Sequence, residues 1–276
     1  MMRDVAVVIG VGGMGLAIAR RIGPGLHVVL SDFDERALES VTGQLRGEGY
    51  GVTPVAANVS SRQAVAGLAA QAASLGRVAA VIHTAGLSPV QAPVSAILAV
   101  DLLGVALVIE EFGEVIAPGG AGVVIASMAG HSYPAFTGQQ ASELAGTPAD
   151  QLLDLPIADP ANFATSGAAY GFAKRANLIR VRAASASWGA KGARINSISP
   201  GIIATPMGQA ELAGANGTAI QALIDGSNAR RVGTAADVAA AAEFLLSPAA
   251  GYISGADLLV DGGVTAALHS NTMTRG

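Results

Sequence analysis

The chain opens with an apolar run that leads directly into a glycine turn. Residues 5–9 are all apolar, which is typical of a strand buried on both faces of a parallel sheet. The turn over residues 10–15 follows at once, and residues 16–21 are predicted to form a helix. Glycines let the backbone of such a turn approach a pyrophosphate, whose charge the helix N-terminus attracts. The unit therefore predicts a dinucleotide site, with phosphate contacts at Gly10, Gly12, Gly13, Met14 and Gly15.

The alternation of strand and helix continues to the end of the chain. Further strands are predicted at residues 27–30, 52–55, 78–83, 122–126, 194–197 and 257–260. Helices are predicted at about 34–48, 61–75, 94–117, 168–189 and 235–246. No linker or repeat divides these units. They predict one α/β domain over residues 1–276, with a Rossmann-type doubly wound parallel sheet of about seven strands and helices on both faces.

The composition argues against several classes of function. The chain is 51% apolar and 13% charged, with a net charge of −4 and no basic run, so no nucleic-acid partner is expected. It has no cysteine, and therefore neither a disulfide framework nor a thiolate site. The four histidines, His27, His83, His131 and His269, lack the spacing of ligand pairs. No metal site is predicted.

The first residues imitate a secretion signal. Met1, Met2 and Arg3 precede the largely apolar stretch 5–19. Asp4 and four glycines interrupt that pattern, however, and two arginines follow it at once. The stretch is also too short to cross a bilayer. We therefore expect a soluble, cytoplasmic protein with no membrane partner.

Tyr170 and Lys174 lie one turn apart on one face of the helix predicted at 168–189. A free phenol has a pKa of about 10, and an ammonium group close to it favours the phenolate. We therefore expect Lys174 to lower the pKa of Tyr170. Such a phenol would exchange protons near neutral pH, as a general acid–base requires.

Asp32 follows the second predicted strand at nearly the spacing from the glycine turn at which a carboxylate binds the ribose hydroxyls of NAD. Gly12 and Phe33 are uncharged, although a 2′-phosphate at these positions would require a basic partner. The pattern predicts NAD as the cofactor in preference to NADP.

These features, with the motifs that follow them, resemble the short-chain dehydrogenase/reductase family over nearly the whole chain. The resemblance implies hydride transfer between a nicotinamide cofactor and a carbon-bound hydroxyl or carbonyl group of a small-molecule alcohol or ketone. The motifs that carry it occur in family order: the glycine turn, Asp32, Asn58-Val59-Ser60, Thr84-Ala85-Gly86, Ser127, Tyr170 with Lys174, and residues 194–201, 205–207, 231–233, 244–247, 252–255 and 260–263.

The resemblance implies a role for each matching residue. Tyr170 would remove the hydroxyl proton in oxidation and return it in reduction, while Lys174 would lower its pKa and hold the nicotinamide ribose. Ser127 would bind the substrate oxygen, unless its hydroxyl simply bonds to backbone at the strand end. The other implied cofactor contacts are Asp32 and Phe33, Asn58 and Val59 beside the adenine, Ala85 and Gly86 near the adenosine ribose, and Pro200, Gly201, Ile203 and Thr205 along the nicotinamide.

Four positions depart from the family pattern. The glycine turn has the spacing of general dinucleotide-binding folds, or is one residue short by the family's own spacing. Asn58 and Thr84 replace the usual aspartate and asparagine. Asp101 stands where the family has an asparagine that holds a water linking the lysine to solvent. We hypothesise that Asp101 takes part in catalysis by keeping this relay and stabilising the Lys174 ammonium.

The connection between Ser127 and Tyr170 is far longer than is common in the family. We expect residues 131–168 to form an inserted active-site segment, with a helix at about 137–146, that serves as a lid or pocket wall. An extended oligomer interface is the alternative. Residues 206–230, which contain several glycines, are predicted to form a substrate-binding lid.

The long insertion, the turn 85–89 and the helix end at Trp188-Gly189 are similar to a bacterial 3α-hydroxysteroid dehydrogenase/carbonyl reductase subgroup. Because few charges lie in the insertion, we expect an apolar, steroid- or terpenoid-like alcohol or ketone.

The family resemblance also implies a homodimer or homotetramer. We expect it to form partly through the helices at 94–117 and 168–189 and the C-terminal strand. Two other functions stay open on this fold. One is a non-catalytic NAD-binding sensor, which only Asp101 favours. The other is a family member that carries out dehydration or epimerisation.

Overall fold

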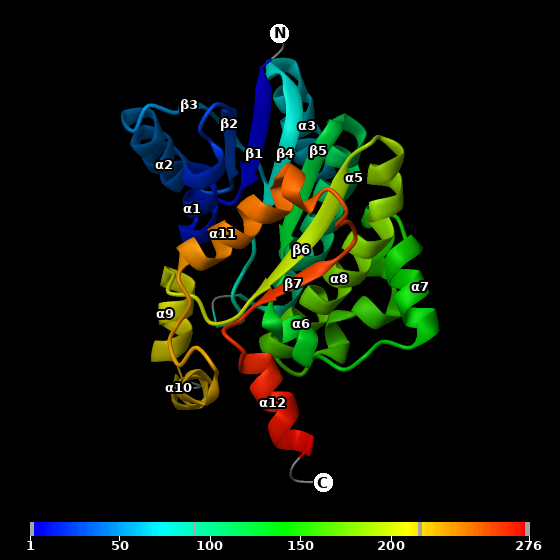
Figure 1. Cartoon of the computed structure of the whole chain (residues 1–276). Helices are drawn as coiled ribbons and strands as arrows, with labels where there is room; N and C mark the ends of the chain where they lie inside the picture. The colour runs from blue at the N-terminus through cyan, green and yellow to red at the C-terminus, as the bar shows by residue number, and fades with distance from the viewer. Residues whose placement is uncertain (1–2, 91, 215–216, 274–276) are drawn as a thin grey trace.

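Seven parallel strands form one sheet through the middle of the molecule, in the order β3-β2-β1-β4-β5-β6-β7 (Figure 1). The computed structural model describes residues 3–90, 92–214 and 217–273; Met1 and Met2 of the signal-like stretch and residues 215–216 of the predicted lid lie outside the described residues. The strands are β1 (Asp4–Ile9), β2 (His27–Asp32), β3 (Gly51–Ala56), β4 (Arg77–His83), β5 (Ile116–Ile125), β6 (Arg194–Pro200) and β7 (Asp257–Val260). The predicted doubly wound parallel sheet is confirmed.

Helices cover both faces of the sheet, and alternate residues of β1 belong to the two cores. Val5, Val7 and Ile9 pack on one side and Ala6 and Val8 on the other, all fully buried. This double burial explains why residues 5–9 of the strand include no polar position. The first face is covered by α3 (Arg62–Leu75), α5 (Val105–Val115) and α8 (Ser166–Ala190), and the second by α1 (Gly13–Ile22), α2 (Glu35–Gly47) and α11 (Ala235–Leu246).

The helix predicted at 94–117 is not one regular α-helix. A short α4 (Val94–Ile97) passes into a π-helical stretch, η1 (Leu98–Gly104), before α5 begins at Val105. The prediction was wrong at its end as well, because Ile116 already starts β5 and pairs with Val78. A π-helical turn widens the helix and marks functional sites in many proteins. Here it contains Asp101.

The long connection folds into short helices that pack on the outer side of the first helical layer. After α6 (Met128–Ser132) come α7 (Gly138–Gly146), as predicted, and three 3-10 turns, η2 (Ala149–Asp154), η3 (Pro156–Ala158) and η4 (Pro160–Asn162). Leu144 and Leu152 are fully buried. Phe163 lies against Phe172 of α8, with ring centroids 5.0 Å apart. The chain itself therefore covers outer surface of α5 and α8, on which we had expected a second subunit.

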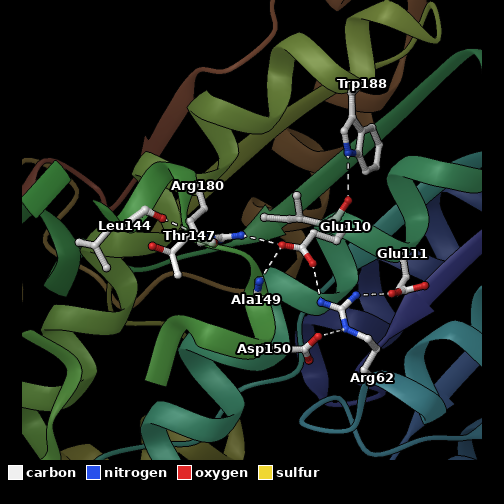
Figure 2. A network of polar contacts seen from close by, with 10 residues as sticks. Arg62, Glu110, Glu111, Leu144, Thr147, Ala149, Asp150, Arg180 and Trp188 are labelled. Atoms are coloured by element: carbon white, nitrogen blue, oxygen red, sulfur yellow. Dashed lines mark hydrogen bonds and ion pairs between the residues drawn. The ribbon is translucent and has the colours of Figure 1, made fainter. Parts of the chain in front are cut away.

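Charged residues fasten this connection to three helices (Figure 2). Arg62 of α3 forms ion pairs with Glu110 and Glu111 of α5 and with Asp150 of η2. Arg180 of α8 pairs with Glu110 at 3.1 Å and donates hydrogen bonds to the backbone carbonyls of Leu144 and Thr147. The Ala149 amide donates to Glu110 at 2.9 Å.

Further helices gather where the strands end. Here lie α9 (Pro206–Ala213) and α10 (Gly217–Gly226). A short turn, η5 (Pro248–Ala250), precedes β7, and α12 (Val264–Met273) follows β7 and extends toward the C-terminus (Figure 1). Among the described residues, no helix is both long and apolar enough to span a membrane.

Candidate active site

A cavity of about 680 Å³ opens at the carboxyl ends of the strands, over the turn between β1 and α1. Of the predicted phosphate contacts, Gly10 and Gly15 are required by the turn itself. Gly10 has φ +95°, and a Cβ there would lie 2.5 Å from the Ala85 nitrogen. A Cβ on Gly15 would lie 1.9 Å from the Gly10 carbonyl oxygen. Close packing of the turn thus excludes side chains at both positions.

Gly12, Gly13 and Met14 lie at the N-terminus of α1 and line the same cavity. A Cβ on Gly12 would meet nothing within 4 Å, because the residue faces open space. No side chain caps this helix end. The amides of its first turn have no partner inside the helix and carry the positive end of its dipole. An anionic group bound in the cavity would be held here.

Asp32 ends β2 at the rim of this cavity. One of its carboxylate oxygens accepts a hydrogen bond from the Val11 amide at 2.8 Å and the other from the Asp34 amide at 3.0 Å. Phe33 next to it is 76% exposed. Asn58, Val59, Ala85 and Gly86 line the cavity as well. Asp32 and Asp34 are the charged residues among the described lining, which contains no cation.

Ser127 and Tyr170 meet although they come from different elements. Ser127 follows β5 and caps α6, where its hydroxyl accepts a hydrogen bond from the Ala129 amide at 3.1 Å. The same side chain lines a cavity together with the Tyr170 phenol of α8 and acts to lower the pKa of that phenol. The hydroxyl therefore bonds to backbone, which was the alternative role for Ser127, and it also lies in one cavity with the Tyr170 phenol.

Lys174 lies beneath the tyrosine and is 3% exposed. Its ammonium lies 5.4 Å from the centre of the Tyr170 ring, as the spacing of four residues predicts. It donates a hydrogen bond to the Ile125 carbonyl at 3.3 Å and lies 3.1 Å from the Asp101 carboxylate. Burial alone lowers the pKa of Lys174, but the charges of Asp101 and Tyr170 raise it above its ordinary value.

Asp101 is fully buried and contacts both the lysine and the loop after β4. Its carboxylate accepts a hydrogen bond from the Leu87 amide at 3.1 Å. A Cβ on Gly86 would lie 2.6 Å from an Asp101 carboxylate oxygen, so the pair depends on the glycine at this point of the loop. Burial raises the pKa of Asp101, while Lys174 and the Leu87 amide act in the opposite direction.

The pKa of Tyr170 is raised, not lowered as we expected from its spacing to Lys174. Burial of the phenol is the largest cause, and the negative charges of Asp101 and Glu211 add to it. Lys174 and the Ser127 hydroxyl pull in the other direction without prevailing. The expectation was wrong because it counted one neighbour on the helix and left out burial and carboxylates from distant segments.

His83 at the end of β4 is buried, and burial together with the Lys174 charge lowers its pKa to about 3. It is therefore a neutral side chain beside the lysine at physiological pH. No cluster of potential metal ligands occurs among the described residues.

A second cavity of about 390 Å³ adjoins the first and contains Ser127 and Tyr170. Met14, Thr205 and Met207 line both cavities, which therefore lie side by side. Pro200, Gly201 and Ile203, predicted to follow the nicotinamide, lie in the second one with Thr205. The Thr205 hydroxyl caps α9 by accepting a hydrogen bond from the Gly208 amide at 3.2 Å.

Glu211 is a residue that the sequence analysis missed. It lies on α9, lines the second cavity and accepts a hydrogen bond from the Ser88 hydroxyl at 2.7 Å. One feature of the sequence pointed to it: Glu211 is the only charged residue between Thr205 and Ile224. Its partner Ser88, far away in sequence, gave no such indication.

Comparison with known proteins finds one family model for each half of the chain. Residues 4–145 match the family model described as short chain dehydrogenase, and residues 159–265 match the model described as Enoyl-(Acyl carrier protein) reductase. The short-chain dehydrogenase/reductase bsc3 of Alternaria brassicicola is 41% identical over 99% of both chains.

Two further proteins are similar to the chain. The 3-alpha-hydroxysteroid dehydrogenase/carbonyl reductase of Comamonas testosteroni is 30% identical, over 67% of this chain and 71% of its own. The solved structure of levodione reductase covers 96% of this chain and 98% of its own at 24% identity, with a TM-score of 0.76, and so shares the fold. The chain belongs to the short-chain dehydrogenase/reductase family, whose members are oxidoreductases that use NAD or NADP.

Proposed function

We propose that the protein is an NAD-dependent oxidoreductase that interconverts a secondary alcohol and its ketone. One observation carries this proposal: Ser127 and Tyr170 lie together in the cavity that adjoins the one over the glycine turn. A substrate in the second cavity would place its oxygen at these two hydroxyls and its carbinol carbon toward the first cavity.

In this proposal, Tyr170 and Ser127 act on the substrate oxygen. The Tyr170 phenolate takes the hydroxyl proton as the alcohol is oxidised, and the phenol returns a proton to the oxygen in reduction. Ser127 donates a hydrogen bond to the oxygen as charge develops on it. The chemistry that a nicotinamide cofactor would supply when bound is hydride transfer from the carbinol carbon in oxidation and to it in reduction.

Lys174 and Asp101 act on Tyr170 from below. The ammonium favours the phenolate, whereas Asp101 holds the ammonium in place and offsets part of its effect. Lys174 would also bind the ribose next to the nicotinamide. We had hypothesised that Asp101 keeps a relay and stabilises the Lys174 ammonium, and the direct ion pair supports the second part, so the role that we propose for Asp101 is the positioning of Lys174.

The first cavity fits a dinucleotide. The free space at Gly12 and the uncapped N-terminus of α1 suit the pyrophosphate. Asp32 at the rim suits two ribose hydroxyls, and the remaining contacts are those predicted, from Asn58 and Val59 to Thr205. We propose NAD as the cofactor because Asp32 would repel a 2′-phosphate and the described lining offers no cation to bind one.

The second cavity suits a substrate with an apolar body. Its lining is mainly Met, Ile, Val, Ala, Pro and Gly, which supports the steroid- or terpenoid-sized ketone or alcohol that we proposed from the insertion. The proposed lid, residues 206–230, contributes Met207, Gly208, Glu211, Gly214 and Ile220. Of residues 131–168 only Gly167 lines the cavity, so the segment would shape the site mainly by supporting α8.

We also propose a cytoplasmic homodimer or homotetramer. Because the inserted segment covers α5 and α8, we place the contact at the free edge of β7, near the exposed side chains of Phe244, Tyr252 and Leu258. Light scattering that finds only monomer at micromolar concentration would rule out this assembly.

The test is NADH formation with NAD, and then NADPH formation with NADP, against a panel of cyclic, aromatic and steroid alcohols. We expect turnover with NAD. Tyr170→Phe should lower kcat by roughly 10²- to 10⁴-fold, the usual contribution of a general acid–base, while NADH still binds. Full activity of Tyr170→Phe would contradict the proposal.

A further inference from the structure

The second cavity contains one group that the proposed chemistry does not use. Ser127 and Tyr170 act on the substrate oxygen, and Thr205 is engaged in capping α9. Glu211 is the only charged residue in the described lining. A carboxylate beside an apolar cavity costs free energy unless it accepts hydrogen bonds, so Glu211 requires hydrogen-bond donors.

Protein groups satisfy Glu211 in part. Ser88, whose side chain is fully buried, donates one hydrogen bond to carboxylate oxygen Oε1. A carboxylate offers about four acceptor sites on its two oxygens. Among the described residues, this is the one hydrogen bond that the Glu211 carboxylate accepts. The group therefore keeps acceptor capacity while it lines the cavity.

Glu211 also lies close enough to the reaction centre for its charge to act there. The negative charge of Glu211 contributes to raising the pKa of Tyr170. The carboxylate and the phenol line the same cavity, from α9 and α8 respectively. A substrate whose reacting oxygen lies at Tyr170 would extend toward Glu211.

We propose that Glu211 determines substrate specificity by accepting a hydrogen bond from a second donor group on the substrate, either a hydroxyl or an ammonium. The inference rests on the proposed function and narrows its substrate class. The preferred substrate has an apolar body with a donor group away from the reacting carbon. The same charge repels substrates that carry a carboxylate at that position.

The energetic reason is that a partly buried charge loses water when the substrate enters. A substrate donor replaces that water, whereas an apolar substrate leaves the carboxylate unpaired. A hydrogen bond to a charged group discriminates by roughly 10- to 100-fold. We expect a preference of that size in kcat/KM.

The test uses cyclohexanol and its ring derivatives with a second hydroxyl, an amine or a carboxylate, in the 1,3 and 1,4 positions. Wild type should prefer the diol and the amino alcohol to cyclohexanol by roughly 10- to 100-fold and should discriminate against the hydroxy acid. Glu211→Gln should keep the diol preference but lose both the amine preference and the discrimination against the acid. Glu211→Leu should lose every preference and gain activity on cyclohexanol.

Two variants serve as controls. Gln209→Leu changes an exposed residue of the same helix outside the cavity and should leave all ratios unchanged. Ser88→Ala removes the protein partner of Glu211 and should keep the diol preference, because the carboxylate still accepts from substrate. If Ser88→Ala abolishes the preference as Glu211→Leu does, or Glu211→Leu keeps the wild-type ratios, Glu211 only fastens α9 and the inference is wrong.

The inference is measurable even if no ring alcohol is oxidised. The change in NADH fluorescence when each ring compound is added reports its binding to the enzyme–NADH complex. The same order of affinities in wild type, lost in Glu211→Leu, would support the role of Glu211 while the proposed reaction failed. If wild type and Glu211→Leu bind each ring compound with equal affinity, the inference about Glu211 is wrong.

Discussion

The carboxylate of Asp101 lies 3.1 Å from the ammonium of Lys174, and their side chains are 0% and 4% exposed. The lysine beside Tyr170 is thus paired on its far side with a negative charge that lies on the π-helical stretch before α5. Asp101 raises the pKa of both Lys174 and Tyr170. The Lys174 charge, which lowers the pKa of Tyr170, is therefore partly offset by the Asp101 charge in the same ion pair.

Replacing Asp101 by Asn should move the pH dependence of oxidation toward lower pH. Oxidation requires the Tyr170 phenolate, so the rate rises as the phenol loses its proton. Removing the negative charge of Asp101 removes a cause of the raised pKa of Tyr170, and the phenolate forms at lower pH. The measurement is log kcat against pH for wild type and Asp101→Asn.

The pH dependence of reduction gives an independent check of the same change. Reduction requires the protonated phenol, so its falling limb should move to lower pH together with the rising limb of oxidation. Identical profiles in the two proteins would show that Asp101 has no part in proton transfer, and a shift toward higher pH would contradict the assigned sign.

Gly86→Ala should separate the Asp101–Lys174 pair. The new methyl group would lie 2.6 Å from an Asp101 oxygen and 3.3 Å from the Lys174 ammonium. Overpacking of this kind costs about 1–3 kcal/mol of unfolding free energy. Gly12→Ala is the matched control, because its methyl group meets nothing within 4 Å. We expect the control to keep its stability in denaturant but to bind NADH more weakly, since the methyl group enters the cavity.

Cofactor preference should change when the charge at the rim of the first cavity is reversed. Asp32→Asn combined with Phe33→Arg removes a repulsive carboxylate and places a cation at position 33, where the phenylalanine is 76% exposed. The ratio of kcat/KM for NADP to that for NAD should rise roughly 10- to 100-fold, the effect of a charge-assisted hydrogen bond. Phe33→Arg alone should do less because Asp32 stays charged. An unchanged ratio in the double variant would show that Asp32 does not select the cofactor.

Arg180→Met should destabilise the fold strongly. The guanidinium is buried and serves Glu110 and the carbonyls of Leu144 and Thr147, which would all lose a donor. We expect a loss of about 3 kcal/mol in urea unfolding. Arg21→Met, in an ion pair whose side chains are 44% and 46% exposed, should cost less than about 1 kcal/mol. Equal losses would mean that the buried network does not hold the inserted segment.

The sheet and most helices were predictable from the sequence because their causes are local. The apolar stretch 5–9 is buried on both faces, and the run of strand–helix units allowed few topologies. The break at Leu98–Gly104 was not predictable. Its residues suit an α-helix, and the wider turn accompanies contacts of Asp101 with Lys174 and Leu87, which are distant in the sequence.

The residues of the candidate site could be predicted from the sequence, but the effect of their charges on the pKa of Tyr170 could not. The helix placed Lys174 under the Tyr170 ring as its spacing required. The direction of the Tyr170 pKa was wrong because burial, Asp101 and Glu211 outweigh the lysine, and none of them is visible from a spacing of four residues. The contact of Glu211 with Ser88 joins segments that only the folded chain brings together.

Because the chain's own inserted segment covers α5 and α8, the support of α8, which carries Tyr170 and Lys174, comes from within one chain. Phe163, Leu144 and Arg180 hold α8 by contacts whose strength does not vary with protein concentration. Diluting the protein until any assembly through β7 separates should therefore leave Tyr170 and Lys174 in place. Specific activity measured at nanomolar enzyme should match that measured at micromolar enzyme.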